Sequence, residues 1–136
     1  MKELTLDAIV SNIDTVTDFV NEELEAHGYS FKARTQIDVA IDELFGNIAR
    51  YAYKEGTGKV TVRLEYDPDG HELTITFIDN GIPFDPLKRD DPDIHLSAEE
   101  REIGGLGIFV VKRTMDAVEY EYKDDCNVLK IRKVLV

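Results

Sequence analysis

The sequence predicts an α+β fold, a two-layer sandwich in which a mixed, mostly antiparallel sheet carries helices on one face. Two long segments place apolar residues at helical spacing, and two pairs of alternating segments joined by short turns are typical of β-hairpins. The chain of 136 residues has the length of one compact domain. We therefore expect a single domain over residues 1–136.

The N-terminal half is expected to contain one strand and two helices. The stretch KELTLDAIV is typical of a strand, and Ser11 or Asn12 can cap a helix that ends at Gly28. A second helix is predicted from about Ala33 to Tyr53, where apolar residues return every three or four positions. The glycines of KEGTG then end this helix.

The C-terminal half is expected to contain two hairpins on either side of a long loop. KVTVRLEY and HELTITFID alternate apolar and polar residues around the turn DPDG at 67–70. Residues 80–103 lose this periodicity, so we predict a long loop with a short helix starting at Ser97; loops of this length usually carry function. A third helix from Gly107 to Met115 and a hairpin of AVEYEY and VLKIRKVLV complete the chain.

The charge balance limits the classes of partner. With 16 basic and 28 acidic residues the net charge is −12, which excludes the basic footprint that nucleic-acid binding needs. Cys126 is the only cysteine, so no internal disulfide forms, and the histidines lack the spacing of zinc ligands. No segment resembles a signal peptide or a membrane span. We expect a cytoplasmic protein that binds neither nucleic acid nor membrane directly.

A polar pair interrupts the apolar face of the second predicted helix. In IDVAIDELFGNIARYAY, at 37–53, Glu43 and Asn47 are four residues apart and therefore lie on the same side of the helix. An asparagine carbonyl oxygen can bind Mg²⁺, and a carboxylate can accept the proton of a hydroxyl that attacks a phosphate. A solvated helix face is the alternative for an isolated pair, but the apolar flanks and two further motifs favour a site.

The second motif ends the strand of the first hairpin. Asp79, Asn80 and Gly81 follow the apolar alternation. A carboxylate at the mouth of a sheet can accept a hydrogen bond from the exocyclic amine of adenine, and Gly81 allows the backbone to approach the base. The local alternative is an ordinary Asn-Gly turn. The following FDP and the glycines downstream favour a nucleotide site.

The third motif is a group of glycines before the third predicted helix. Gly104, Gly105 and Gly107 precede a helix start that is expected near Ile108. Glycines permit close approach of a phosphate, and the free N–H groups at a helix start attract anions. The alternative is a flexible hinge in front of a core helix.

These three motifs together resemble the N, G1 and G2 boxes of the GHKL ATPase superfamily, whose domain is the Bergerat ATP-binding fold. The matching segments are DELFGNIARYAY at 42–53, FIDNGIPFDP at 77–86 and GGLGIFVVKRTMD at 104–116, in the family's order and spacing. The resemblance covers most of the chain from Ala33 to Val136. IDVAIDEL before the first box and NVLKIRK near the end most resemble the anti-sigma factor serine/threonine protein kinases of bacterial partner-switching systems.

The resemblance implies ATP and Mg²⁺ as cofactors and a role for each motif. Glu43 would be the catalytic base. Asn47 would bind Mg²⁺ and also contact ATP. Asp79 and Gly81 would form the adenine site. The triphosphate would be held by Gly104, Gly105, Leu106, Gly107 and Ile108.

A lid over residues 82–103 would supply a cation to the γ-phosphate, and the sequence does not rank Lys88, Arg89 and Arg101 for this role. The chain also departs from the family pattern. Ile103 stands in place of a first glycine, and Asn127-Val128 replaces a frequent Gly-Thr, so a hydroxyl contact to phosphate is either missing or supplied by Asn127.

The function implied by the resemblance is phosphoryl transfer from ATP to a serine or threonine of a small anti-sigma factor antagonist. Such kinases can also sequester a sigma factor. A non-catalytic, nucleotide-gated binding module and a nucleotide-free structural domain are the alternatives. The presence of both Glu43 and Asn47 favours the kinase, because a binding module has no use for a base. The identity of the partner and the formation of a homodimer stay open.

Overall fold

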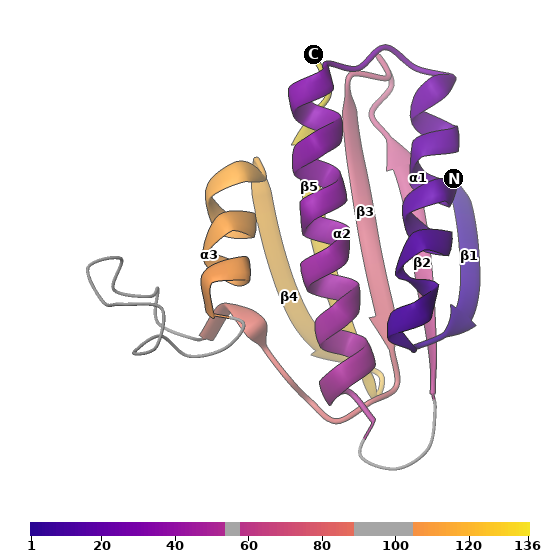
Figure 1. The fold of residues 1–136 in the computed structure, drawn as a ribbon. Helices are drawn as coiled ribbons and strands as arrows, with labels where there is room; N and C mark the ends of the chain where they lie inside the picture. Colours follow the sequence, from indigo (N-terminus) through magenta and orange to yellow (C-terminus); the bar gives the residue numbers. More distant parts are fainter. Residues whose placement is uncertain (54–57, 89–104) are drawn as a thin grey trace.

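The structure is a computed structural model that describes residues 1–53, 58–88 and 105–136, arranged in two layers (Figure 1). One layer is a five-stranded sheet with the order β1-β2-β3-β5-β4, and the helices of the described residues lie on one of its faces. The predicted two-layer α+β fold is therefore confirmed. All pairings between the described strands are antiparallel, although a mixed sheet was expected.

Every strand and helix predicted within the described residues is present. The strands are β1 Lys2–Asp7, β2 Lys59–Tyr66, β3 Glu72–Asp79, β4 Ala117–Lys123 and β5 Cys126–Val134. The helices are α1 Ile13–Glu25, α2 Phe31–Tyr51 and α3 Gly105–Thr114, with short 3₁₀ turns η1 Val10–Asn12 and η2 Pro86–Lys88. The short helix predicted at Ser97 lies outside the described residues.

Helix α1 ends earlier than predicted, at Glu25 instead of Gly28. Asn12 precedes the helix, but its side chain does not cap it. Its Nδ2 donates instead to the backbone carbonyl oxygen of Asp7, at 2.9 Å. Val16, Val20 and Leu24, four residues apart along the helix, are buried on one face.

Helix α2 begins two residues earlier than predicted because Ser30 caps it. The Ser30 hydroxyl accepts a hydrogen bond from the N–H of Ala33 at 3.0 Å, which satisfies one of the free donors of the first turn. Phe31, the first helical residue, is 83 % exposed, so the first turn carries no buried apolar residue that a periodicity pattern could detect there. The helix start is therefore set by the cap.

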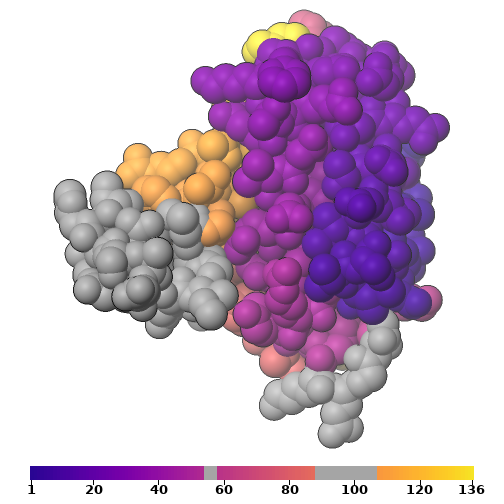
Figure 2. Space-filling model, viewed as in Figure 1, coloured from indigo at the N-terminus to yellow at the C-terminus, as the bar shows by residue number. Residues whose placement is uncertain are grey.

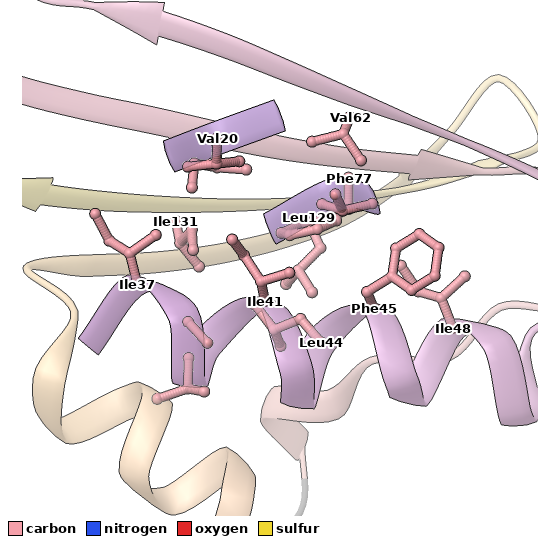
Figure 3. Packing of buried hydrophobic residues seen from close by; sticks show 14 of the residues in the cluster. Val20, Ile37, Ile41, Leu44, Phe45, Ile48, Val62, Phe77, Leu129 and Ile131 are labelled. Carbon is pink, nitrogen blue, oxygen red and sulfur yellow. The ribbon is translucent and has the colours of Figure 1, made fainter. Parts of the chain in front are cut away.

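The hydrophobic core lies between the sheet and the helices α1, α2 and α3 (Figure 3). Figure 3 shows α2 with its apolar side chains directed toward β3 and β5, and Figure 2 shows α1 and α2 covering this side of the molecule. The fully or almost fully buried side chains of α2 are Ile37, Ile41, Leu44 and Phe45. Each is worth about 1.5–3 kcal/mol relative to exposure. The helix that carries Glu43 and Asn47 is therefore firmly held.

The opposite face of the sheet carries charged side chains. Lys59 bonds Asp7 across β1 and β2 at 2.6 Å, and Arg63 bonds Glu3 at 2.9 Å. An antiparallel sheet with one polar face needs helices on its other face only, which explains the two layers. Within the described residues, no helix combines the length and the apolar character needed to cross a bilayer.

Candidate functional site

A pocket lies between the C-terminal half of α2 and the adjacent ends of β3 and β5. The enclosed cavity has a volume of about 30 Å³, within about 380 Å³ of space between atoms that is partly open to solvent. The residues that line it are Leu44, Asn47, Ile48, Ala52, Asp79, Phe84, Pro86, Tyr120, Asn127 and Leu129. A mostly apolar wall with a few polar groups is the usual composition of a small-molecule site.

Asp79 reaches this pocket because of the alternation of β3. Every second residue of a strand points to the same face, so Asp79 continues the buried row that contains Phe77. Directly opposite on β5, Asn127 continues the row of Leu129. Asp79 is 3 % exposed and Asn127 is 5 % exposed. A carboxylate and an amide thus occupy the last facing pair at this end of the core.

The Asp79 carboxylate is hydrogen-bonded through one of its two oxygens. Its Oδ1 accepts from the N–H of Gly81 at 2.8 Å and from Nδ2 of Asn127 at 2.9 Å. Burial raises the pKa of Asp79, and the bonds from Asn127 and Gly81 oppose this shift. Among the described residues no donor binds Oδ2. This oxygen is therefore the acceptor that Asp79 can offer to a ligand.

Gly81 lies where the chain leaves β3 and passes the end of α2. The N–H of Ile82 donates to the carbonyl oxygen of Ala52 at 2.8 Å, and a Cβ on Gly81 would overlap that same carbonyl group. Glycine is thus required here by a close approach of two backbone segments. The approach of Gly81 to a nucleobase stays a prediction.

The structure brings Glu43 and Asn47 together on α2. Nδ2 of Asn47 donates to Oε1 of Glu43 at 3.2 Å, and both side chains are half-buried. Asn47 lines the pocket, and Glu43 lies one turn nearer the start of the helix. Because its nitrogen is directed to Glu43, Asn47 has its carbonyl oxygen available for a cation.

Helix α3 begins at Gly105, three residues before the start expected near Ile108. Gly105, Leu106 and Gly107 thus form its first turn instead of preceding it. The physical reason is tertiary packing, because Ile108 is buried in the core and α3 packs against α2. Ile108 is not among the residues that line the pocket, and its contact with the cofactor stays a prediction.

The first turn of α3 lies directly on the predicted base. A Cβ on Gly107 would overlap the Glu43 carboxylate. Gly104 lies outside the described residues, as do Arg89 and Arg101 of the predicted lid. Lys88 is the last residue of η2.

Of the two alternatives for the hydroxyl contact to phosphate, missing or supplied by Asn127, the register of β3 and β5 favours the first. Asn127 faces Asp79 directly, and its amide donates to that carboxylate. The alternation of Ile131 and Leu129 points to Asn127 as the next inward residue, but the partner strand could not be known from local sequence. Tyr120 is a second lining residue that the sequence did not reveal.

The chain is similar to known proteins over most of its length. A model of the histidine kinase-like ATPase domain matches residues 6–133. Serine-protein kinase RsbW of Listeria monocytogenes serovar 1/2a is 31% identical over 112 residues, covering 79% of this chain and 70% of that protein. Serine-protein kinase RsbW of Bacillus cereus (strain ATCC 10987) is 29% identical over 111 residues, covering 79% of this chain and 68% of that protein.

A solved structure is similar in fold. The crystal structure of the RsbU and RsbW domains of Rv1364c from Mycobacterium tuberculosis matches 99% of this chain with a TM-score of 0.64. The sequence identity is 16%, and the chain spans 33% of that longer protein. This likeness shows the fold.

Proposed function

Because the chain belongs to the histidine kinase-like ATPase family, we propose that it binds Mg-ATP in the pocket and transfers the γ-phosphoryl group to a protein hydroxyl. The observation that carries this proposal is the pairing of a buried acceptor, Asp79, with the Glu43–Asn47 pair on α2, around one apolar pocket. The names of the serine-protein kinase relatives support the class of reaction.

The adenine base would lie at the Asp79 end of the pocket. Oδ2 of Asp79 would accept from the exocyclic amine, and the side chains of Ile48 and Leu129 would contact the faces of the ring. Burial raises the pKa of Asp79, and the hydrogen bonds from Asn127 and Gly81, which favour the ionised form, oppose this shift and support its role as an acceptor.

The phosphates would lie between α2 and the first turn of α3. The N–H groups at the start of a helix have no partner within the helix and attract anions, so the backbone of Gly105 to Gly107 suits a phosphate. The Asn47 carbonyl oxygen would be a protein ligand of Mg²⁺, which prefers oxygen ligands and keeps several waters. When bound, the metal ion supplies charge neutralisation at the phosphates.

Glu43 would remove the proton of the attacking hydroxyl. In the transfer, the hydroxyl oxygen forms a bond to the γ-phosphorus while the bond from that phosphorus to the bridging oxygen of ADP breaks, and the proton passes to the Glu43 carboxylate. The hydrogen bond from Asn47 and the contact with Gly107 would hold this carboxylate in place.

The acceptor would be a serine or threonine on a small protein that resembles an anti-sigma factor antagonist. The RsbW relatives and the resemblance of the motifs support this choice. We further propose that the protein sequesters a sigma factor and works in the cytoplasm, where ATP is available.

The decisive experiment is γ-phosphate transfer by Glu43→Ala, measured with radiolabelled ATP and an antagonist-like protein from the same genome. We expect this variant to bind ATP in calorimetry like the wild type and to transfer phosphate about 10²–10⁴-fold more slowly. Asp42→Ala is the matched control, because Asp42 is the exposed neighbouring carboxylate on the same helix.

Transfer by Glu43→Ala at the wild-type rate would falsify the role of Glu43 as base. ATP binding by the wild type without transfer to any such protein would indicate the nucleotide-gated binding module instead. The absence of ATP binding at millimolar concentration would contradict the proposed function as a whole.

A further inference from the structure

The side chain of Asn127 is buried and uses its full hydrogen-bonding capacity. Nδ2 donates to Oδ1 of Asp79 at 2.9 Å and to the carbonyl oxygen of Ile82 at 2.8 Å. Oδ1 accepts from the N–H of Phe84 at 3.1 Å and from the hydroxyl of Tyr120. A side-chain amide has two donor hydrogens and two acceptor sites, so Asn127 has nothing left for a ligand.

These bonds connect three segments that line one pocket. Asp79 ends β3, Tyr120 belongs to β4, and residues 82–84 follow the turn after β3. The side chains of Ile82 and Phe84 are 40 % and 36 % exposed, so they do not anchor this segment by burial. The segment is therefore held by its backbone bonds to Asn127 and by the bond from the N–H of Ile82 to the carbonyl oxygen of Ala52.

We propose that Asn127 is a positioning residue for recognition of the nucleobase. It holds the Asp79 carboxylate by Oδ1, so that Oδ2 is presented to the base, and it holds the backbone that places Phe84 in the pocket wall. This inference rests on the proposed function, because it gives Asn127 a part in binding the base without contact with it.

The chemistry of the position favours an amide. A hydroxyl has one donor hydrogen and could not serve both Asp79 and the carbonyl oxygen of Ile82. A carboxylate has no donor and would place a second negative charge against Asp79, so that the two groups would titrate as a pair. A leucine would keep the approximate size and remove every hydrogen bond.

The pH dependence of ADP binding distinguishes these cases. In the wild type, we expect affinity to fall as the pH is lowered, because burial raises the pKa of Asp79 and a proton on Oδ2 would remove the acceptor that faces the base. In Asn127→Asp, we expect binding at pH 8 to be weaker than in the wild type by on the order of 10-fold or more. As the pH falls, a proton shared by the two carboxyl groups restores an O–H donor to Asp79, so the ratio of the two affinities should approach one.

In Asn127→Leu no proton can replace the missing donor. This variant should bind ADP weakly at every pH, again by on the order of 10-fold. Val128→Ala is the matched control, because Val128 is the next residue of β5 and faces the opposite side of the sheet. The other titratable groups around the pair are Tyr53, Asp85, Tyr120 and Cys126, and all variants retain them, so the ratio to the wild type isolates the change at position 127.

Amide hydrogen exchange measured by NMR tests the positioning without nucleotide. In Asn127→Leu the N–H of Phe84 loses its acceptor and should exchange at least about 10-fold faster. The N–H of Ala52 is the internal control, because its acceptor is the carbonyl oxygen of Ile48, and it should keep its protection. A variant that failed to fold would lose protection at both positions.

Two results would overturn the inference. One is wild-type affinity for ADP in Asn127→Leu, and the other is an Asn127→Asp variant whose deficit relative to the wild type does not shrink as the pH falls. If the wild type bound no nucleotide at any pH, the proposed function would fail and the role of Asn127 with it. Wild-type binding with unaffected variants would remove the role of Asn127 alone.

Discussion

Asp79 is a residue whose burial works against the stability of the fold. Because burial raises its pKa above that of an unfolded aspartate, the folded state binds the proton more tightly, and the ionised carboxylate lowers stability above that raised pKa. A buried charge that lowers stability at neutral pH is typical of residues that bind a ligand.

The substitution Asp79→Asn should therefore separate stability from function. We expect it to raise the thermal midpoint at pH 7, and to leave it near the wild-type value at about pH 3, where aspartate is protonated in both states. The new amide oxygen can still accept from Gly81 and Asn127. ATP binding should nevertheless weaken by about 1–3 kcal/mol, since an amide nitrogen would face the exocyclic amine. Calorimetry and thermal unfolding at both pH values measure this, and unchanged ATP affinity would remove Asp79 from the site.

Gly107 fixes the position of the Glu43 carboxylate, because only glycine leaves room for it there. In Gly107→Ala the new methyl group would overlap the Glu43 carboxylate and displace it. We expect phosphate transfer to fall at least about 10-fold, because a displaced base loses much of its 10²–10⁴-fold contribution. Single-turnover transfer at saturating ATP measures this step.

Gly46→Ala on α2 is the control for that variant. There the new methyl group meets the end of the flexible, exposed Arg50 side chain, which can move. Alanine favours a helix over glycine by up to about 1 kcal/mol, so this variant should keep its activity and gain stability. Full activity in Gly107→Ala would show that the Glu43 position is not limited by α3.

At the scale of elements, the β4–β5 turn is strained in a way that substitution can relieve. Asp124 and Asp125, the central residues of this two-residue turn, have φ values of 54° and 60°. Such turns favour Asn-Gly or Asp-Gly, so aspartate suits the first position, Asp124, and glycine suits the second, Asp125. Asp125→Gly should therefore raise the free energy of unfolding by about 0.5–1 kcal/mol.

Denaturant unfolding measures this gain, and Asp69→Gly is the matched control. Asp69 lies in the β2–β3 turn, where only Gly70 has a positive φ, of 74°. Glycine at position 69 would add freedom to the unfolded chain without relieving strain, so a loss of up to about 1 kcal/mol is expected. An equal change in both variants would contradict the strain argument.

The hairpins were predictable from sequence because their signals are local. Alternating apolar residues and a DPDG or KDD turn indicate two adjacent strands whatever the rest of the chain does. The start of α3 was missed because its first turn contains two glycines, which disfavour a helix, and packing on α2 stabilises it. The start of α2 was missed because its first turn is exposed and its signal is the Ser30 cap.

At the scale of the whole molecule, the pairing of β3 with β5 was beyond the reach of sequence reasoning. The bond between Asp79 and Asn127 joins residues 48 positions apart, and no turn signal links their strands. The sequence therefore indicated Asp79, Glu43 and Asn47 as site residues but not the network around Asn127. A residue that contacts the site from a strand distant in sequence can be identified only when the strand order is known.

The strand order also has a consequence for the order of events during synthesis. β5 is the last element of the chain, yet it lies between β3 and β4, and it supplies Asn127 and Leu129 to the pocket wall. A nascent chain on the ribosome that has not yet released β5 lacks one side of that wall, and pairing distant strands is a slow step in folding. If the protein binds nucleotide as proposed, this competence should arise only after β5 has left the ribosome and paired with β3.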